Sequence, residues 1–174
     1  LLALARADSD VPALMARLDL DRLAIDVARE WVARAMDRRI DLGFEAAQDP
    51  CYVEGNEVLL RELLANLLDN AIRYTGAGGR VTARVIAGDS VVLEVEDNGI
   101  GIESNDRERV FERFYRVLGT ETEGSGLGLA IVRSIAEVHR ARVALDPNPQ
   151  GRGTTVRVAF PRSRAEPQPL RTAA

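Results

Sequence analysis

One segment, 57–74 (EVLLRELLANLLDNAIRY), constrains the fold of this chain more than any other. At about 100° per residue its leucines gather on one side of a helix, so that side must face a core. The next segments, 80–87 and 91–96, alternate apolar and polar residues around Gly88 and Asp89, which predicts a hairpin. A long helix beside hairpin strands favours a mixed sheet that helices cover on one face.

Further segments fit the same architecture. Apolar side chains recur at helical spacing in 21–37, and the apolar segment 127–138 also predicts a helix. Gly55 and Asn56 offer a cap for the helix 57–74. A shorter helical run and four more strands are predicted at 108–114, 40–46, 51–53, 143–145 and 154–160.

The composition excludes several classes of function. The chain has 174 residues with 23 basic and 27 acidic side chains, and its net charge of -4 gives duplex nucleic acid no electrostatic reason to bind. The single cysteine, Cys51, cannot form an internal disulfide or a cysteine-based metal site, and the single histidine, His139, excludes a multi-histidine centre. No run approaches the roughly 18 uninterrupted apolar residues of a membrane span.

Four polar residues, Glu62, Asn66, Asn70 and Arg73, fall within about one quadrant of the helix 57–74. Asparagine is a weak helix former, so two of them in mid-helix are unusual. Amide oxygens one turn apart suit a hard cation such as Mg²⁺, which completes its shell with phosphate and water. The alternative is an ordinary solvated helix face, and this segment alone leaves both interpretations open.

Residues 97–101 (DNGIG) place a carboxylate at the end of a predicted strand, followed by two glycines. The glycines let the backbone turn sharply beside a ligand. Asp97 can accept a hydrogen bond from an exocyclic amine such as that of adenine. Asp-Asn-Gly is also favoured in plain turns, so the motif alone does not decide between a site and a turn.

Residues 124–129 (GSGLGL) lead into the predicted helix 127–138. Glycine-rich backbone before a helix N-terminus supplies free N–H groups and the positive end of the helix dipole, which suit an anion. The segment has no lysine, so it is not a phosphate loop that ends in Gly-Lys-Ser/Thr. Its glycines follow a long polar loop instead of a strand, which excludes a dinucleotide fingerprint.

Taken in order, these segments resemble the ATP-binding domain of sensor histidine kinases, in the superfamily that includes gyrase, Hsp90 and MutL. The resemblance spans about 19–161, nearly the whole chain. The segments similar to the family's N, G1, F and G2 boxes and to its last strand are 66–75 (NLLDNAIRYT), 97–101, 111–116 (FERFYR), 124–129 and 151–161.

The resemblance implies an α/β fold of the Bergerat type, a two-layer sandwich with a mixed sheet of about five strands covered on one face by about three helices. It implies ATP and Mg²⁺ as cofactors. Asp97 would hold the adenine amine, and Asn66 and Asn70 would bind Mg²⁺ or phosphate. Arg73 stands where the family often has Lys and keeps a positive charge for the phosphates, and Tyr74 would line the pocket. Further nucleotide-binding residues implied by the boxes are Gly99, Gly101, Arg116, Gly124, Ser125, Gly126, Leu127, Gly128 and Leu129.

The same resemblance implies a lid. Phe111, Phe114 and Arg116 would anchor it, and the polar segment 117–125 is expected to close over the triphosphate.

The N box also bears on the reaction. Hydrolases of the superfamily carry a Glu at its first position as general base, where this chain has Asn66. An amide does not take a proton near neutral pH, so transfer to an acceptor other than water is favoured. Glu62, one turn earlier, is a carboxylate on the same face that could assist, unless it is simply a helix-surface residue. Asn66 and Glu62 are therefore the catalytic candidates.

The phosphoacceptor is expected outside this sequence. His139 lacks the acceptor context of the family and is interpreted as a helix-end histidine near the C-terminal dipole. Segment 1–10 is interpreted as the stub of an upstream dimerisation and phosphoacceptor hairpin, 11–161 as the ATP-binding domain and 162–174 as a disordered tail. The implied partners are that hairpin and the receiver domain of a response regulator. The parent is expected to be a homodimer anchored in the bacterial inner membrane, with this part a monomeric cytoplasmic fragment.

Two other functions remain open from the sequence. One is a related ATPase that drives a conformational change, against which Asn66 counts. The other is a nucleotide-binding module without catalysis, or a Ser/Thr kinase of the same fold.

Overall fold

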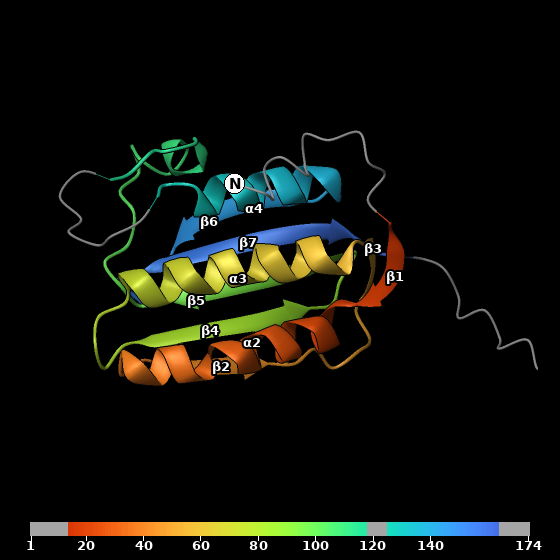
Figure 1. Cartoon of the computed structure of the whole chain (residues 1–174), viewed down its shortest axis with the longest axis horizontal. Helices are drawn as coiled ribbons and strands as arrows, with labels where there is room; N and C mark the ends of the chain where they lie inside the picture. Colours follow the sequence, from red (N-terminus) through yellow and green to blue (C-terminus); the bar gives the residue numbers. More distant parts are fainter. Residues whose placement is uncertain (1–13, 118–124, 164–174) are drawn as a thin grey trace, which may run out of the picture.

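The computed structural model describes residues 14–117 and 125–163, which form two layers. Three helices of the described residues lie on one face of a five-stranded sheet (Figure 1). The helices are α2 (Leu20–Asp37), α3 (Glu57–Tyr74) and α4 (Gly128–Val138), with a 3-10 turn η1 (Arg109–Phe111). The strands are β1 (Ala16–Asp19), β2 (Asp41–Glu45), β3 (Tyr52–Gly55), β4 (Arg80–Ile86), β5 (Ser90–Asp97), β6 (Arg142–Pro147) and β7 (Thr154–Pro161).

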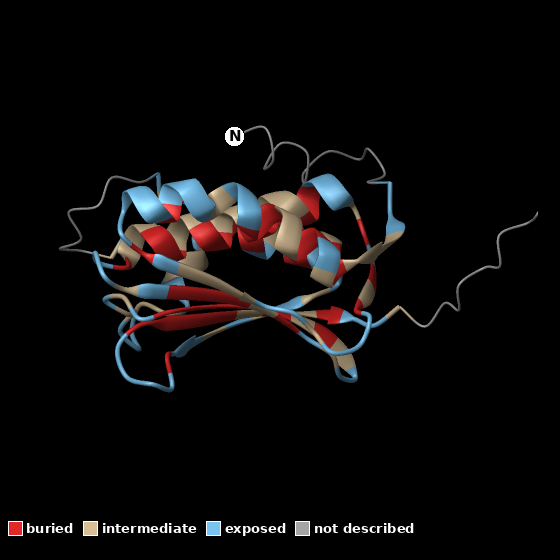
Figure 2. Cartoon of the chain, turned by 90° about the horizontal axis from the view of Figure 1, so that it is seen from below, coloured by how far each residue is buried: buried red, intermediate tan, exposed pale blue. Residues whose placement is uncertain are grey.

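The large sheet is mixed, as the sequence predicts. Its strand order is β2-β4-β5-β7-β6, with β2 parallel to β4 and the other neighbours antiparallel. Figure 2 shows the helices together on one side of this sheet. The predicted α/β two-layer sandwich is confirmed, and so is the predicted hairpin of β4 with β5. The two predicted closing strands, β6 and β7, pair antiparallel with each other.

A second, two-stranded sheet joins β1 to β3, and the sequence analysis missed β1. Its residues (ARLD) alternate apolar and polar over only four positions, and their partners lie far along the chain. Arg17 of β1 stacks over the ring of Tyr52 in β3, with 3.9 Å between the guanidinium carbon and the ring centroid. A pairing of this kind depends on contacts that a local pattern does not contain.

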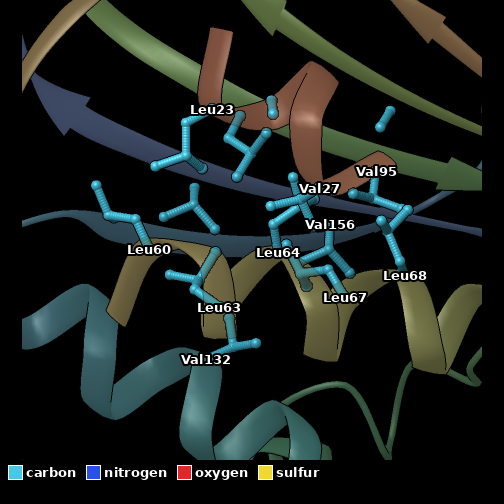
Figure 3. Close-up of a cluster of buried hydrophobic side chains, with 14 of the residues drawn as sticks. Leu23, Val27, Leu60, Leu63, Leu64, Leu67, Leu68, Val95, Val132 and Val156 are labelled. Carbon is cyan, nitrogen blue, oxygen red and sulfur yellow. The ribbon is translucent and has the colours of Figure 1, made fainter. Parts of the chain in front are cut away.

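Helix α3 lies at the centre of the core. The five apolar residues predicted to face the core are all buried, and Figure 3 shows α3 leucines directed toward α2 and toward the sheet. Leu63 also points toward Val132 of α4 (Figure 3). Because α3 contacts both neighbouring helices as well as the sheet, its buried sector is wider than predicted. The predicted residues are Leu60, Leu64, Leu67, Leu68 and Ala71, and the additional buried ones are Leu59, Leu63 and Ile72.

Most predicted boundaries agree with the structure to within one or two residues, but the helical run 108–114 was wrong. Only the single turn η1 forms there, and Phe114 has a φ of 66°, outside the helical range. None of the described helices is long and apolar enough to cross a bilayer. The predicted stub 1–10 and all but the first two residues of the predicted tail 162–174 lie outside the described residues.

His139 links the C-terminus of α4 to the N-terminus of α3. It caps the C-terminus of α4, its ring is buried, and its Nδ1 lies 2.7 Å from the carbonyl oxygen of Ile135. The backbone N–H of Asn56, the N-cap of α3, donates to its Nε2 at 3.0 Å. These two contacts assign the proton of a neutral ring to Nδ1. Burial lowers the pKa of His139 below its ordinary 6.5, so the ring favours the neutral form.

The His139 contact predicts a specific dependence of stability on pH. Because the pKa is lowered in the folded state, the neutral ring stabilises the fold fully above pH 6.5, and this contribution is lost as the pH falls through the folded-state pKa. The substitution His139→Leu should remove this part of the pH dependence. At pH 8 it should cost about 1–3 kcal/mol, because the N–H of Asn56 loses its acceptor.

Urea unfolding of both chains at pH 8 and at pH 5.5 measures this effect. An equal loss of unfolding free energy between the two pH values in wild type and His139→Leu would contradict the assignment.

Candidate functional site

The predicted site residues converge on one cavity. It lies between the C-terminal half of α3, the end of β5, the segment after it and the start of α4. Eleven of the predicted residues line it: Asn66, Asn70, Arg73, Tyr74, Asp97, Gly101, Arg116, Ser125, Gly126, Gly128 and Leu129.

Four predicted residues do not line this cavity or cannot be placed. Glu62 lies one turn before the lining part of α3 and contributes its backbone carbonyl to Asn66. Gly99 lies behind the wall, where an added Cβ would meet the carbonyl oxygen of Tyr74 at 2.3 Å. Leu127 is buried in the core. Gly124 lies outside the described residues, as does most of the predicted lid 117–125.

Asp97 is a buried carboxylate at the end of β5. Its Oδ1 accepts hydrogen bonds from the N–H groups of Gly99 at 2.8 Å and Thr154 at 3.3 Å. Burial nevertheless raises the pKa of Asp97 to about 6, which outweighs the lowering by those two donors. Within the described residues, both hydrogen bonds to this carboxylate go to Oδ1, which leaves Oδ2 for a donor in the cavity.

The two asparagines of α3 present polar atoms to the start of α4. Asn66 donates its Nδ2 to the carbonyl of Glu62 at 2.8 Å, so its Oδ1 is left for another partner. The Nδ2 of Asn70 is buried and makes no hydrogen bond within the described residues. A Cβ added at Gly128 would lie 3.0 Å from that Nδ2 and 3.4 Å from Oδ1 of Asn66. A buried amide without a partner is costly, which is typical of a group that a ligand satisfies.

Arg73 forms an ion pair with Asp69, a carboxylate that was not among the predicted site residues. Asp69, one turn earlier on α3, pairs through Oδ2 with Arg73 and through Oδ1 with Arg34 of α2, at 2.7 Å for the second pair. Asp69 also lines the cavity. Asp69 lies between the two guanidinium groups and so holds Arg73 along the wall of the cavity. Arg73 is the residue that the family resemblance predicts as a positive charge for the phosphates.

The start of α4 has an open N-terminus. Leu127 at the N-cap makes no side-chain hydrogen bond, so within the part of the chain that the structure describes the first N–H groups of α4 are available to an anion. Gly126, just before it, has a φ of 68°, and an added Cβ would meet the carbonyl carbon of Phe114 at 2.8 Å. The N–H of Phe114 donates to the carbonyl of Gly126 at 2.9 Å, while its ring is 72% exposed. The F-box segment is therefore joined to the glycine loop through backbone, with the Phe114 ring left outside.

Two further lining residues were missed because their signals are not local. Tyr115 donates its hydroxyl to Asp106 at 2.6 Å, which fixes the chain beside the cavity. Thr154 opens β7 and reaches Asp97 through its N–H. The segment 151–161 was recognised as a closing strand, but nothing in its pattern indicates that the strand starts against Asp97.

The sequence matches, over residues 55–164, the family described as histidine kinase-, DNA gyrase B-, and HSP90-like ATPase. It is 39% identical over 171 residues to the sensor protein kinase PmrB of Pseudomonas aeruginosa and 38% identical over 168 residues to the sensor histidine kinase CusS of Escherichia coli K12. These alignments cover 95% and 92% of this chain but 35% and 34% of those proteins. The chain thus spans about a third of the length of these relatives.

Solved structures agree with these sequence matches. A mycobacterial sensor histidine kinase, MprB, is 30% identical with a TM-score of 0.74, covering 86% of this chain and 98% of that chain. Full-length ShkA in complex with AMPPNP is 29% identical with a TM-score of 0.82, covering 99% of this chain and 36% of that chain.

The orphaned amide of Asn70 predicts an unusual effect on stability. In the absence of any ligand, Asn70→Leu should raise the unfolding free energy by about 1 kcal/mol, because a buried donor without an acceptor is replaced by an apolar group of similar size. Asn66→Leu, one turn earlier on α3, is the matched control. It should not raise the unfolding free energy, because it loses the hydrogen bond to the carbonyl of Glu62. Urea unfolding of the three chains measures this, and a loss of stability in Asn70→Leu would show that its amide has a partner in the folded chain.

Proposed function

The chain belongs to the histidine kinase-, DNA gyrase B-, and HSP90-like ATPase family, and we propose that it is the ATP-binding catalytic domain of a sensor histidine kinase. In this proposal it transfers the γ-phosphoryl group of Mg-ATP to a histidine on an upstream hairpin, for relay to an aspartate of a response regulator. One observation carries the proposal. A buried carboxylate with a free oxygen, Asp97, faces the same cavity as the unpartnered Nδ2 of Asn70 and the uncapped N-terminus of α4.

The two ends of the cavity suit the two ends of ATP. Oδ2 of Asp97 would accept the exocyclic amine of adenine, and Tyr74 would lie along the nucleotide. At the other end, the first N–H groups of α4, with Gly126 and Gly128, would receive the triphosphate. Gly128 is required there because a side chain would fill the space in front of Asn66 and Asn70. Arg73 and Arg116 line the same cavity and would offset phosphate charge.

The donor set fits a magnesium ion that is bound mainly through ATP. Nδ2 of Asn66 is bonded to the carbonyl of Glu62, and among the described residues no hydrogen bond reaches its Oδ1. A Cβ added at Gly128 would lie within 3.4 Å of both that Oδ1 and the amide of Asn70. Mg²⁺ accepts a small number of protein oxygens and takes phosphate and water for the rest of its shell. No group of three or more His, Cys, Asp or Glu side chains gathers in the described part of the chain, which agrees with a metal held by few protein ligands. When bound there, the ion would neutralise developing phosphate charge.

The residues around the phosphate end favour a kinase over a hydrolase. Asn66 occupies the position of the general base in the related hydrolases, and an amide does not take a proton from water. Among the described residues, the carboxylates on the cavity wall are Asp69 and Asp97. Asp69 is paired with two arginines, and Asp97 is assigned to the end of the cavity that would hold adenine. Glu62 does not line the cavity, so its assistance remains a prediction. The matched relatives are sensor kinases, and the alternative of an ATP-driven conformational module is not favoured.

The acceptor histidine would come from outside this chain. His139 is buried, its Nε2 accepts from Asn56, and it lies at the opposite end of α4 from the cavity. The partners in this proposal are the upstream dimerisation hairpin and a response regulator receiver domain. The full protein would be a homodimer anchored in the bacterial inner membrane, with this domain on its cytoplasmic side.

Asp97→Asn tests the base end of the site. The Nδ2 of the new amide would face the adenine amine when its oxygen takes the place of Oδ1, so the affinity for Mg-ATP should fall about 10- to 100-fold. Asp89→Asn, in the exposed turn between β4 and β5, is the matched control and should bind as wild type. Calorimetric titration with ATP and Mg²⁺ measures this, and an unchanged dissociation constant in Asp97→Asn would contradict the role of the carboxylate.

The same titration carries an internal check on pH. Because the pKa of Asp97 is raised to about 6 and the ionised form is the better acceptor, ATP affinity should fall as the pH drops from 7.5 to 5.5. Asp97→Asn should lack this component.

Phosphoryl transfer tests the activity itself. Incubated with γ-labelled ATP, the chain alone should carry no label, while the upstream hairpin of its full-length protein, added as a second chain, should acquire acid-labile label. Asn70→Ala should abolish that label, because it removes an amide from the phosphate end. Label on the chain alone that disappears in His139→Gln would overturn this account of the acceptor.

A further inference from the structure

Asn148 is a buried residue in a largely exposed turn. The turn connects β6 to β7, and Asn148 is 6% exposed although residues 146, 147 and 149–152 face solvent. A role in the turn 147–153 does not explain this burial, because asparagine residues in turns are usually exposed to solvent. The side chain is instead folded under the turn, toward the end of β5.

Each polar group of Asn148 has a defined partner. Its Nδ2 donates to the backbone carbonyl of Asp97 at 2.7 Å and to Oε1 of Glu96 at 3.5 Å, and its Oδ1 accepts from the N–H of Gln150 at 2.7 Å. Its own N–H donates to the carbonyl of Gly153 at 3.2 Å. Because a donor and an acceptor lie on opposite sides of the amide, its orientation is fixed by its contacts.

The bond to Asp97 continues the sheet where the strand pairing stops. Between β5 and β7 the last paired residues at this end are Glu96 and Thr155, so Asp97 lies beyond that ladder. The Asn148 amide supplies the donor that a further strand residue would otherwise give to the Asp97 carbonyl.

The same turn also holds the Asp97 side chain. Thr154 donates its N–H to Oδ1 of Asp97 at 3.3 Å. Gly153, with a φ of 122°, lies so close that an added Cβ would be 1.9 Å from the Asp97 carbonyl oxygen. The segment 148–154 therefore holds both the backbone and the carboxylate of Asp97. The side chain of Asn148 makes the hydrogen bond to the Asp97 backbone.

We propose that Asn148 is a positioning residue that sets the base selectivity of the nucleotide site, by fixing Asp97 so that its free Oδ2 meets the 6-amino group of adenine. The inference rests on the proposed ATP-binding function and adds a residue outside the four boxes. The end of β5 is also paired with β4 through Asp97 and Val81. Without the Asn148 bond it loses its hold on the β7 side, so the direction of Asp97 toward the adenine is less strictly fixed. Among the described residues, no hydrogen bond joins this turn to α3 or α4, which build the triphosphate end of the site, so that end should be unaffected.

The test compares ATP with inosine triphosphate, which has an oxygen in place of the 6-amino group. Calorimetric dissociation constants with Mg²⁺ are measured for the 174-residue chain and for three variants. Asn148→Ala removes the whole contact. Asn148→Asp keeps the side-chain volume and the acceptor for Gln150 but removes the donor to Asp97, and it also places a carboxylate beside that of Glu96, so Asn148→Ala is the primary test. Gln150→Ala is the control in the same turn, since its exposed side chain does not touch Asp97.

Wild type should prefer ATP over inosine triphosphate by about 10-fold or more. In Asn148→Ala and Asn148→Asp this preference should shrink to within about 3-fold, through a loss of ATP affinity, with inosine triphosphate binding changed less than about 2-fold. Gln150→Ala should keep the preference of wild type. Urea unfolding of each variant under the titration conditions establishes that the folded chain is being measured.

Three results would overturn the proposal. The first is an unchanged preference for ATP in both Asn148 variants. The second is an equal loss of affinity for the two nucleotides, which would make the contact a structural support of the whole site. The third is a wild-type chain that binds both nucleotides equally. That result would remove the adenine role of Asp97 itself, and it differs from a failure of the proposed function, in which wild type binds neither nucleotide.

Discussion

The burial of one side of α3 fixes the position of almost everything else. Its leucines pack against the sheet and α2, and Leu63 packs toward α4, so the helix cannot rotate about its axis without exposing core residues (Figure 3). Asn66, Asn70 and Arg73 lie on the remaining side of the same helix, which α4 partly covers. The direction of the polar side chains is thus set by apolar residues one or two positions away. A core substitution in α3 should therefore act on ligand binding as well as on stability.

The cavity contains several polar groups whose requirements the fold does not meet. Asp97 is buried enough that its pKa is raised to about 6, and Nδ2 of Asn70 has no partner in the described residues. Elsewhere in the described residues the buried hydroxyls of Thr75 and Thr155 also lack a hydrogen-bond partner, but the one other buried carboxylate row is paired. On the strand face turned away from the helices, Glu94 is nearly inaccessible yet lies between Arg84 and Arg157, which are its register partners on β4 and β7. Glu94 is thus neutralised by two arginines, whereas no arginine pairs with the buried carboxylate of Asp97 in the described residues, and this contrast favours a ligand at Asp97.

Most of the fold could be predicted from the sequence because its elements carry local signals. Helix α3 begins and ends as predicted, since Asn56 caps it and Thr75 leaves the helical range. Asp97 and the glycines around Gly128 were found because their chemistry depends on neighbours in the chain. The errors involve contacts between distant segments. Strand β1 exists through its pairing with β3, and the run 108–114 fails to form a helix because its end is joined to Gly126. Asn148 and Thr154 belong to the site only because β7 lies beside β5.

The two helices of the site are tied together at one end and open at the other. Far from the cavity, His139 at the end of α4 accepts from Asn56 at the start of α3, and burial keeps its ring neutral. At the cavity, the same helices meet through the unpartnered amide of Asn70, the small residue Gly128 and an uncapped N-terminus. The fold thus completes its own hydrogen bonds at the end that His139 closes, and at the other end it presents a donor and helix N–H groups that a ligand would complete.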